Sequence, residues 1–364
     1  MELKTTPLIN EHKKLGAKLA PFGGWLMPIN YSSIIEEHNW TRSSCSIFDI
    51  CHMGEFIIEG KPEEVGLDNI LTVNLSQMPS GRCRYGFMLN DKGGVIDDLI
   101  VYKINDTKWM LVVNAATTDK DQSHIKKYLS GDYRFENMSE CTAKLDLQGP
   151  ESAQVLKSIA GDKIEDLSYY TFGTFSILGE DCIVSRTGYT GELGYEIYIS
   201  ADKAKALWDI VLKDKRVRPA GLGARDTLRL EMGYVLYGQD IDETTSPIEA
   251  LKEKHIDFGK NFIGKEALLK QKDNGVKRNL VGFISDTRRS PRHDYKAYSG
   301  DKEIGTVTSG SFSPSLSCGI GMGYVLTEYN EVGQRITIKN DNIQIESKIV
   351  DKPFYKNINP GERK

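Results

Sequence analysis

The sequence predicts an α+β protein that ends in a small all-β domain, and three observations support this prediction. The chain has 364 residues, and single hydrophobic cores stop growing near about 250–300 residues, so two or more domains are expected. Helical and strand patterns mix as far as about residue 270. Beyond that point the patterns are those of strands and turns, which is typical of a small β-barrel or sandwich.

The patterns before residue 270 predict helices and strands in alternation. A helix is expected over residues 33–44, because apolar side chains between Ile34 and Trp40 lie on or near one face and two glutamates occupy the first turn, where the helix dipole favours negative charge. Amphipathic patterns predict further helices over 121–129 and 201–213. Strands are expected at 56–58, 85–89, 95–102 and 109–113, with a turn cluster at 90–94.

A change of composition near residues 273–275 indicates a linker between two domains. Apolar and polar residues alternate over 336–338 and again over 343–345, with a turn cluster between them. This period of two predicts a β-hairpin. We therefore expect one domain over residues 1–270 and a second over 276–358.

Composition and charge exclude several classes of protein. The net charge of −4 and the pI near 6.0 argue against a nucleic-acid binder, which usually has a basic field. No apolar run approaches the ~20 residues that span a bilayer, and the first residues resemble neither a signal peptide nor a transit peptide. The six cysteines show no CxxC spacing, so we expect free thiols and no metal site. A cytoplasmic location is the simplest expectation.

Two adjacent aspartates, Asp97 and Asp98, interrupt the apolar run over residues 95–102. Neighbouring residues of a strand point to opposite faces, so one carboxylate is expected to point inward and the other toward solvent or a turn. A buried carboxylate costs free energy unless something pairs with it. A strand that opens with a turn-capping aspartate explains the pair about as well as a functional acid, base or electrostatic anchor does.

A glycine-rich loop contains three glycines between Gly188 and Gly194, which allow the backbone to approach a ligand closely. Tyr189 offers a flat ring, and Glu196 offers a bidentate acceptor. A lone example of this pattern is better explained as an ordinary glycine-rich turn. The loop matches neither a phosphate-binding P-loop nor a dinucleotide fingerprint.

A second glycine-rich turn, over residues 220–224, leads to Arg225. It is typical of a turn that enters a helix, where free N–H groups favour anions, and the planar guanidinium of Arg225 can clamp a carboxylate. Taken alone, a solvated arginine is the favoured interpretation. In residues 48–55, His52 is more often structural than catalytic, and Met53 more often packs in a core than against a heterocycle.

Together these stretches resemble the aminomethyltransferase family of glycine cleavage T-proteins, nearly from end to end. The order and spacing of the motifs make the resemblance specific, although each motif alone is weak. It implies a multi-lobed folate-binding α+β domain, with two lobes within residues 1–270, followed by a small C-terminal β-barrel. The matching stretches are 6–8, 22–28, 48–56, 93–101, 113–114, 147–150, 186–196, 221–226, 236–239, parts of 257–267, 308–310 and 313–316.

The resemblance also implies the reaction. A one-carbon unit passes from the aminomethyl-dihydrolipoyl arm of H-protein to tetrahydrofolate, ammonia leaves, and 5,10-methylenetetrahydrofolate forms. Tetrahydrofolate is then a co-substrate and lipoylated H-protein a partner, with no metal, nucleic acid or membrane involved.

The resemblance assigns roles to particular residues. Asp98 matches the key aspartate near the folate N5 and N10 atoms, where a fixed carboxylate would stabilise the positive charge that develops on the carbon. Glu196 matches the residue that binds the pterin, and Arg225 matches a folate-binding arginine. The positions that match pocket-lining residues are Tyr189, Tyr85, Met53 and Asn114, and Arg363 is a looser candidate for a basic residue that contacts folate.

The chain departs from the family pattern at two places. Cys51 stands where serine is usual, and residues 250–256 include Lys252, Glu253 and Lys254 where relatives typically have an apolar Gly-Leu-Gly-Trp-like stretch. The second change motivates an alternative, a folate-dependent demethylase of a small methylated amine or sulfonium compound on the same scaffold. A non-catalytic folate-binding protein is less favoured, because residues 237–239 lack the cysteine pattern expected before them.

Overall fold

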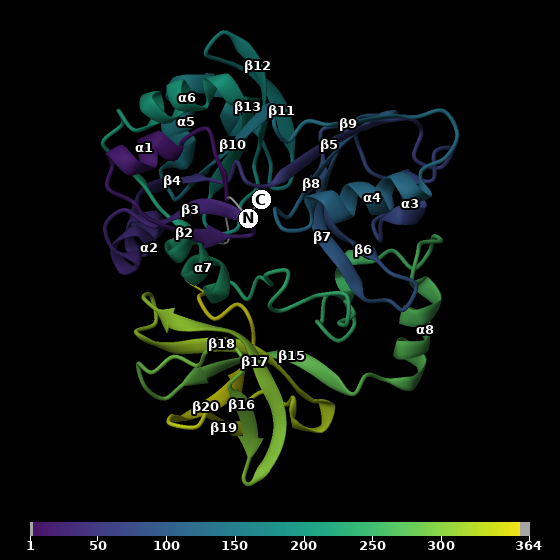
Figure 1. Cartoon of the computed structure of the whole chain (residues 1–364), viewed down its shortest axis with the longest axis vertical. Helices are drawn as coiled ribbons and strands as arrows, with labels where there is room; N and C mark the ends of the chain where they lie inside the picture. The colour runs from purple at the N-terminus through teal and green to yellow at the C-terminus, as the bar shows by residue number, and fades with distance from the viewer. Residues whose placement is uncertain (1–2, 357–364) are drawn as a thin grey trace. The chain divides into compact units, whose positions relative to one another are not determined.

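The computed structural model describes residues 3–356, which form two compact units. The first unit comprises residues 3–86 and Leu99–Asp226, and the second comprises Phe87–Asp98 and residues 227–356. The domain borders expected at residues 270 and 276 remain a prediction. Each unit is described by itself below, with the element labels of Figure 1.

The first unit begins with a small three-stranded sheet in the order β1–β3–β2. Helix α2 follows as predicted, and the Ser33 side chain caps it by accepting the Glu36 N–H at 3.2 Å. Its buried face is more polar than expected: Ile35 is 46 % exposed, whereas Glu37 and His38 are buried. The elements are β1 (Lys4–Thr5), α1 (Ile9–Lys14), β2 (Lys18–Phe22), β3 (Trp25–Asn30) and α2 (Ile34–Ser43).

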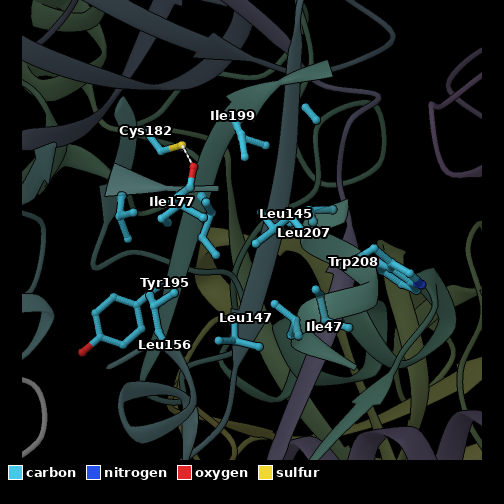
Figure 2. Packing of buried hydrophobic residues seen from close by; sticks show 14 of the residues in the cluster. Ile47, Leu145, Leu147, Leu156, Ile177, Cys182, Tyr195, Ile199, Leu207 and Trp208 are labelled. Carbon is cyan, nitrogen blue, oxygen red and sulfur yellow. Dashed lines mark hydrogen bonds between the residues drawn. The ribbon is translucent and has the colours of Figure 1, made fainter. Parts of the chain in front are cut away.

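A six-stranded sheet in the order β11–β12–β13–β10–β4–β14 forms the centre of the first unit. One face of β10 packs Leu145 and Leu147 into an apolar cluster with Leu207 and Trp208 of α6 (Figure 2). The strands are β4 (Cys45–Asp49), β10 (Thr142–Gln148), β11 (Phe172–Ile177), β12 (Glu180–Ser185), β13 (Gly194–Ser200) and β14 (Val217–Pro219). The associated helices are α5 (Ser152–Ala160), η1 (Asp162–Asp166), η2 (Ala201–Lys203) and α6 (Ala204–Val211).

A five-stranded sheet has the order β6–β7–β8–β5–β9. The strands and the turn predicted from the sequence between residues 56 and 113 are present, and the turn is closed by a hydrogen bond of 2.9 Å from the Asn90 N–H to the Gly94 carbonyl. The elements are β5 (Gly54–Glu59), α3 (Leu67–Ile70), β6 (Cys83–Leu89), β7 (Val95–Asn105), β8 (Lys108–Val113), α4 (Thr118–Tyr128) and β9 (Arg134–Asn137).

The second unit contains a closed β-barrel in the order β15–β18–β17–β16–β19–β20 (Figure 1). The predicted hairpin is β19–β20, in which Ile338 pairs with Ile345, and its alternating isoleucines fill the barrel interior. The predicted α+β fold with a C-terminal barrel is therefore confirmed. The elements are η3 (Glu253–His255), α8 (Lys265–Asn274), β15 (Arg278–Ser285), β16 (Lys296–Ser299), β17 (Lys302–Ser313), β18 (Cys318–Leu326), η4 (Thr327–Tyr329), β19 (Arg335–Lys339) and β20 (Gln344–Val350). Helix α7 (Leu222–Glu231) begins among the residues of the first unit and ends among those of the second.

Candidate active site

Strand β10 has a second buried face, and this face is polar. Its leucines point into the apolar cluster, so the alternating residues Lys144, Asp146 and Gln148 point to the opposite side. Each of the three is at most 1 % exposed. Buried polar side chains destabilise a fold unless they have partners. Here the partners come from β13, from the loop that precedes it and from α7.

Three buried charges, Lys144, Asp146 and Glu196, and the partly buried Arg225 form one layer, here named the charge layer. The strand register places Asp146 directly opposite Glu196, and like charges in this position destabilise a sheet. Lys144 Nζ lies 3.0 Å from Glu196 Oε1, and Arg225 Nη1 forms an ion pair with Asp146 Oδ2. The two cations therefore balance the two carboxylates within the layer.

The surroundings shift the pKa values of the two carboxyl groups of the layer in opposite directions. Burial opposes the ionisation of Glu196, but Lys144 and the Thr187 hydroxyl outweigh burial and lower its pKa. Burial raises the pKa of Asp146 to about 6 although Arg225 opposes the rise. When the pair takes up a proton near pH 6, that proton therefore goes to Asp146, while Glu196 stays ionised.

Hydroxyl groups support the second oxygen of Glu196. Thr187 Oγ1 donates to Glu196 Oε2, and Tyr102 lies 3.5 Å from the same oxygen. The Tyr102 hydroxyl is in turn 2.8 Å from that of Tyr198 and 3.1 Å from that of Ser185. Such a network fixes the orientation of the carboxylate, as a binding group requires.

The glycine-rich loop between Gly188 and Gly194 packs against a side chain of the protein itself. A Cβ atom at Gly188 or Gly194 would lie 2.1–2.6 Å from the Gln148 amide group, so a larger residue would have to displace this buried, hydrogen-bonded amide. Gln148 Nε2 donates to Asp146 Oδ1 at 2.6 Å, and Thr190 Oγ1 donates to Gln148 Oε1 at 2.5 Å. The sequence suggested that the backbone of this loop approaches a ligand closely. In the structure the group that it approaches is the Gln148 amide.

Four of the residues predicted for the site lie together in or beside the charge layer. Glu196 and Arg225 belong to it, and the guanidinium carbon of Arg225 lies 5.1 Å from the centre of the Tyr189 ring. Met53 Sδ accepts a hydrogen bond of 3.6 Å from Lys144 Nζ. Arg225 is thus a partly buried, paired charge with a side chain 13 % exposed, and the interpretation as a solvated charge is wrong.

The start of helix α7 binds an anion, as its glycine-rich turn predicted, but the anion is a side chain of this chain. Glu37 Oε2 accepts the Gly221 N–H at 2.8 Å. The other oxygen, Oε1, accepts the N–H groups of Tyr31 and Ser32 at 2.6 and 2.9 Å. This explains why Glu37 is buried on α2, and it fixes the helix that presents Arg225.

The histidine in residues 48–55 is structural rather than exposed for catalysis. His52 is 6 % exposed, its ring meets that of Phe22 edge to face at 5.6 Å, and burial lowers its pKa to about 4. Asp49, on the neighbouring strand end, binds His12 Nε2 at 2.7 Å. These contacts tie the N-terminal segment to β4.

Asp97 and Asp98 lie on β7, in the part of this strand that belongs to the second unit. Asp97 is fully buried and Asp98 is half-buried. The start of β7 is fixed because the Val95 N–H lies 3.0 Å from the carbonyls of both Asp242 and Thr245. A Cβ at Gly94 would lie 1.9 Å from the Glu243 carbonyl oxygen, so the turn before the aspartates requires glycine.

The remaining predicted residues lie elsewhere in the chain. Tyr85 on β6 and Asn114, which follows β8, are both half-buried residues of the first unit. Arg363 lies outside the described residues. Within residues 3–356 no group of three or more His, Cys, Asp or Glu side chains could hold a metal. Over the same residues no helix is long and apolar enough to cross a membrane.

The lysine-containing stretch at 250–256 forms a tight turn in the second unit. Leu251 adopts a left-handed φ of 57°, and the Lys252 N–H donates to the Pro247 carbonyl at 2.8 Å. Burial lowers the pKa of Lys252 to about 8, and the nearby Lys254 lowers it further, whereas the charge of Asp98 acts in the opposite direction. The departure from the family pattern therefore places a lysine within electrostatic reach of Asp98.

Comparison with known proteins identifies the family. Residues 8–260 match the GCVT N-terminal domain, and residues 278–356 match the glycine cleavage T-protein C-terminal barrel domain. An aminomethyltransferase from Halothermothrix orenii is 46 % identical over 97 % of this chain and 100 % of its own length. One from Caldanaerobacter subterraneus subsp. tengcongensis is 43 % identical over 97 % of this chain and 96 % of its own.

A solved structure agrees with these sequence matches. The glycine cleavage system aminomethyltransferase T from Bartonella henselae is 34 % identical and superposes with a TM-score of 0.92, covering 98 % of this chain and 99 % of its own. The fold and its paired domains thus define a transferase of the one-carbon class. The chain belongs to the glycine cleavage T-protein family. These matches confirm the resemblance and support the aminomethyltransferase prediction, not the demethylase alternative.

Sequence reasoning did not find several residues that build the site. Lys144, Asp146 and Gln148 were not singled out, and neither were Thr187 and Tyr102. A signal for the first three was present, because polar residues alternate with apolar ones over 143–148. That alternation is typical of a half-exposed strand, and only the structure shows that its polar face is buried.

Proposed function

We propose that the chain transfers a one-carbon unit from the aminomethyl-dihydrolipoyl arm of H-protein to tetrahydrofolate, releasing ammonia and forming 5,10-methylenetetrahydrofolate. The observation that supports this most strongly is the match to relatives named aminomethyltransferase over 97 % of the chain. Tetrahydrofolate supplies the nitrogen atoms that accept the carbon. The residues of this chain bind it, orient it and stabilise charge.

Glu196 fits the role of pterin-binding residue. Its carboxylate is buried, its pKa is lowered by Lys144 and Thr187, and both of its oxygens are oriented by hydrogen bonds. An ionised carboxylate accepts from two parallel N–H donors, which is what the amino group and ring N–H of a pterin present. We propose that Glu196 fixes the ring in this way.

Asp98 is our proposed electrostatic catalyst. Transfer of the aminomethyl carbon develops positive charge on that carbon, and a fixed carboxylate lowers the energy of such a state. The tight turn at Gly94 and the two carbonyls on the Val95 N–H hold the backbone that carries Asp98. A covalent bond to Asp98 is not part of the proposal.

The other predicted residues contribute binding surface in this proposal. Tyr189 and Met53 border the charge layer and offer apolar and aromatic contact to a flat ring. Arg225 already pairs with Asp146, so it would contact folate with the N–H donors that this pair leaves available. Tyr85 and Asn114 are proposed to line the same pocket.

The proposal can be tested with purified components. The chain is mixed with tetrahydrofolate and with H-protein that carries the aminomethyl-dihydrolipoyl group, and ammonia and methylenetetrahydrofolate are measured. The two products should form in equal amounts and only when both substrates are present. Absence of product above background would overturn the proposal. Turnover of a small methylated amine or sulfonium donor in the same assay would favour the demethylase instead.

Two further parts of the prediction belong to the proposal. Lipoylated H-protein is the proposed donor and partner, and a cytoplasmic site of action is the proposed location. Co-purification with loaded H-protein tests the first. Fractionation of cells that express the tagged chain tests the second.

A further inference from the structure

Glu55 provides a third buried carboxyl group next to the charge layer. Glu55 lies on β5 and is 2 % exposed. Its backbone is satisfied, because its N–H donates to Ser139 Oγ at 3.0 Å and its carbonyl accepts the Met138 N–H at 2.8 Å. Its side-chain Oε1, in contrast, is buried without a hydrogen-bond partner among residues 3–356. A buried oxygen left in this state requires an explanation.

The surroundings of Glu55 come from several elements. Lys144 of β10 and Glu196 of β13 act on its charge, and its own charge acts on Tyr198 of β13 and on Cys51 before β5. Its strand neighbour on the same face, Ile57, packs against a buried cluster. The cluster comprises Cys83, Tyr102, Met110, Val112 and Tyr198. The carboxyl group therefore lies in a dry, partly aromatic environment beside the Lys144–Glu196 pair.

The charge balance of the layer leaves no cation for Glu55. Arg225 pairs with Asp146, and Lys144 donates to Glu196 at 3.0 Å and to Met53 at 3.6 Å. An ionised Glu55 would add an uncompensated negative charge to a buried site, which is strongly unfavourable. Burial raises the pKa of Glu55 to about 8, although Lys144 opposes the rise. In its neutral form, the Glu55 carboxyl group has one O–H donor.

We propose that Glu55 is a further ligand-binding residue of this site, which stays protonated and donates its carboxyl hydrogen to an acceptor atom on the ring of the bound reduced pterin. This rests on the proposed function, since it takes the folate ring as the occupant next to Glu196. The two carboxyl groups then have opposite tasks: Glu196, ionised, accepts from ring N–H groups, and Glu55, neutral, donates to a ring nitrogen or carbonyl.

Two substitutions separate a hydrogen-bond donor from a mere space-filling residue. Glu55→Gln keeps a neutral donor of the same shape, whereas Glu55→Met removes it. Affinity for 5-formyltetrahydrofolate, a stable reduced folate, is measured by calorimetry at pH 7. Glu55→Gln should bind within about threefold of the wild type, and Glu55→Met about tenfold more weakly, because one hydrogen bond of about 1.4 kcal/mol corresponds to that factor. Equal affinities for all three proteins would overturn the proposal.

The pH dependence of binding is the sharper readout. The neutral acid is the form that binds, so wild-type affinity should fall about fivefold between pH 8 and pH 9 as Glu55 ionises. Glu55→Gln should keep its affinity over this range. Glu59→Gln, a control on the same strand with a half-buried carboxylate paired to Lys108 at 3.0 Å, should follow the wild type. A Glu55→Gln profile that falls with the wild type would overturn the proposal.

An infrared titration of the unliganded protein tests the protonation state without any ligand. A carboxylic-acid C=O band that is present at pH 7, disappears above about pH 8, and is missing in Glu55→Gln is the expected result. Absence of this band at pH 7 would overturn the proposal whatever the protein binds. A protein that shows the band but binds no reduced folate would refute the proposed function, and the ligand assigned to Glu55 with it.

Discussion

The charge layer of the first unit and the Arg229–Asp240 pair of the second unit are both buried, yet they are satisfied differently. Arg229 Nη1 donates to Asp240 Oδ2 at 2.8 Å and to the Tyr234 carbonyl at 2.9 Å, and Nη2 donates to Ser309 Oγ at 2.9 Å. Asp240 also accepts from the Leu236 N–H, Ser309 and Thr308. One cation meets one carboxylate, and the surrounding donors and acceptors of the same unit complete the pair.

The charge layer, in contrast, has an additional carboxyl group and an incomplete set of partners. Glu55 lies beside it with an oxygen that has no partner within the described residues, and Arg225 retains a side chain that is 13 % exposed, against 1 % for Arg229. Completed networks add structural specificity, whereas an unsatisfied buried group requires an explanation, such as a ligand that contributes the missing partner. The comparison therefore fits an assignment of the Arg229–Asp240 pair to stability and our proposal that the charge layer serves binding.

The largest effect is expected from breaking the buried Arg229–Asp240 pair. Asp240→Ala leaves the Arg229 guanidinium buried without its carboxylate, and such a loss costs about 3–5 kcal/mol of unfolding free energy. Urea unfolding measures this. As a control, Glu328→Ala removes an exposed ion pair with Lys302, whose side chains are 54 and 63 % exposed, and should change stability by at most about 1 kcal/mol. Similar losses in both variants would contradict the assignment to stability.

Asp98→Asn should affect rate rather than stability. Removal of the charge that stabilises the transition state is expected to reduce kcat by about 10²–10³-fold, as for the loss of one electrostatic catalyst. The midpoint of unfolding should stay near that of the wild type, since Asp98 is only half-buried. Asp91→Asn, on the exposed turn of the same hairpin, is the control and should keep full turnover. An Asp98→Asn enzyme with unchanged kcat would remove Asp98 from the mechanism.

Glu196→Gln sharpens the role of the charge layer in binding. The amide cannot accept from two N–H donors at once, and it leaves Lys144 without a counter-ion, so affinity for reduced folate should fall about 10–100-fold, the range of a charged hydrogen bond. Calorimetry with 5-formyltetrahydrofolate measures this. Asp181→Asn, an exposed residue on β12, should bind as the wild type does. If Glu196→Gln bound equally tightly, the pterin would have to contact another group.

The last effect, the pH dependence of stability, accumulates over several pH units. The pKa of Glu55 is raised by burial from 4.5 to about 8, so the folded protein retains a proton that the unfolded chain loses between these values. The unfolding free energy should therefore decrease as pH rises from 4.5 to 8, by at most about 1.4 kcal/mol per pH unit, and level off above. Urea unfolding of the wild type and Glu55→Gln should diverge over this window, and parallel curves would show that Glu55 is already ionised in the folded state.

Much of the architecture could be predicted from local patterns. The strand–turn–strand unit over 85–102 and the hairpin over 336–345 were found because their alternation and turn residues lie within one short stretch. The six-stranded sheet was largely missed. Its strands β4, β10 and β13 are far apart in the chain, so no short turn marks them as neighbours. The alternation over 143–148 does not show that β10 is buried on both faces.

The site, like the fold, could be predicted from the sequence only in part. The motif positions of Glu196 and Arg225 could be taken from the resemblance, but their partners could not. Lys144 and Asp146 become site residues because β10 pairs with β13 in one register. A shift of one residue would turn both toward the apolar cluster.

The sequence by itself determined the fold class, the family and the residues that carry the family motifs, because these depend on local periodicity and on the order of short stretches. Only the tertiary structure decided which charges are neighbours. Glu37 caps α7 from a helix that precedes it by 184 residues, and two cations and three carboxyl groups meet in one buried place. Burial and pairing set the protonation of a side chain, and both depend on residues distant in the sequence.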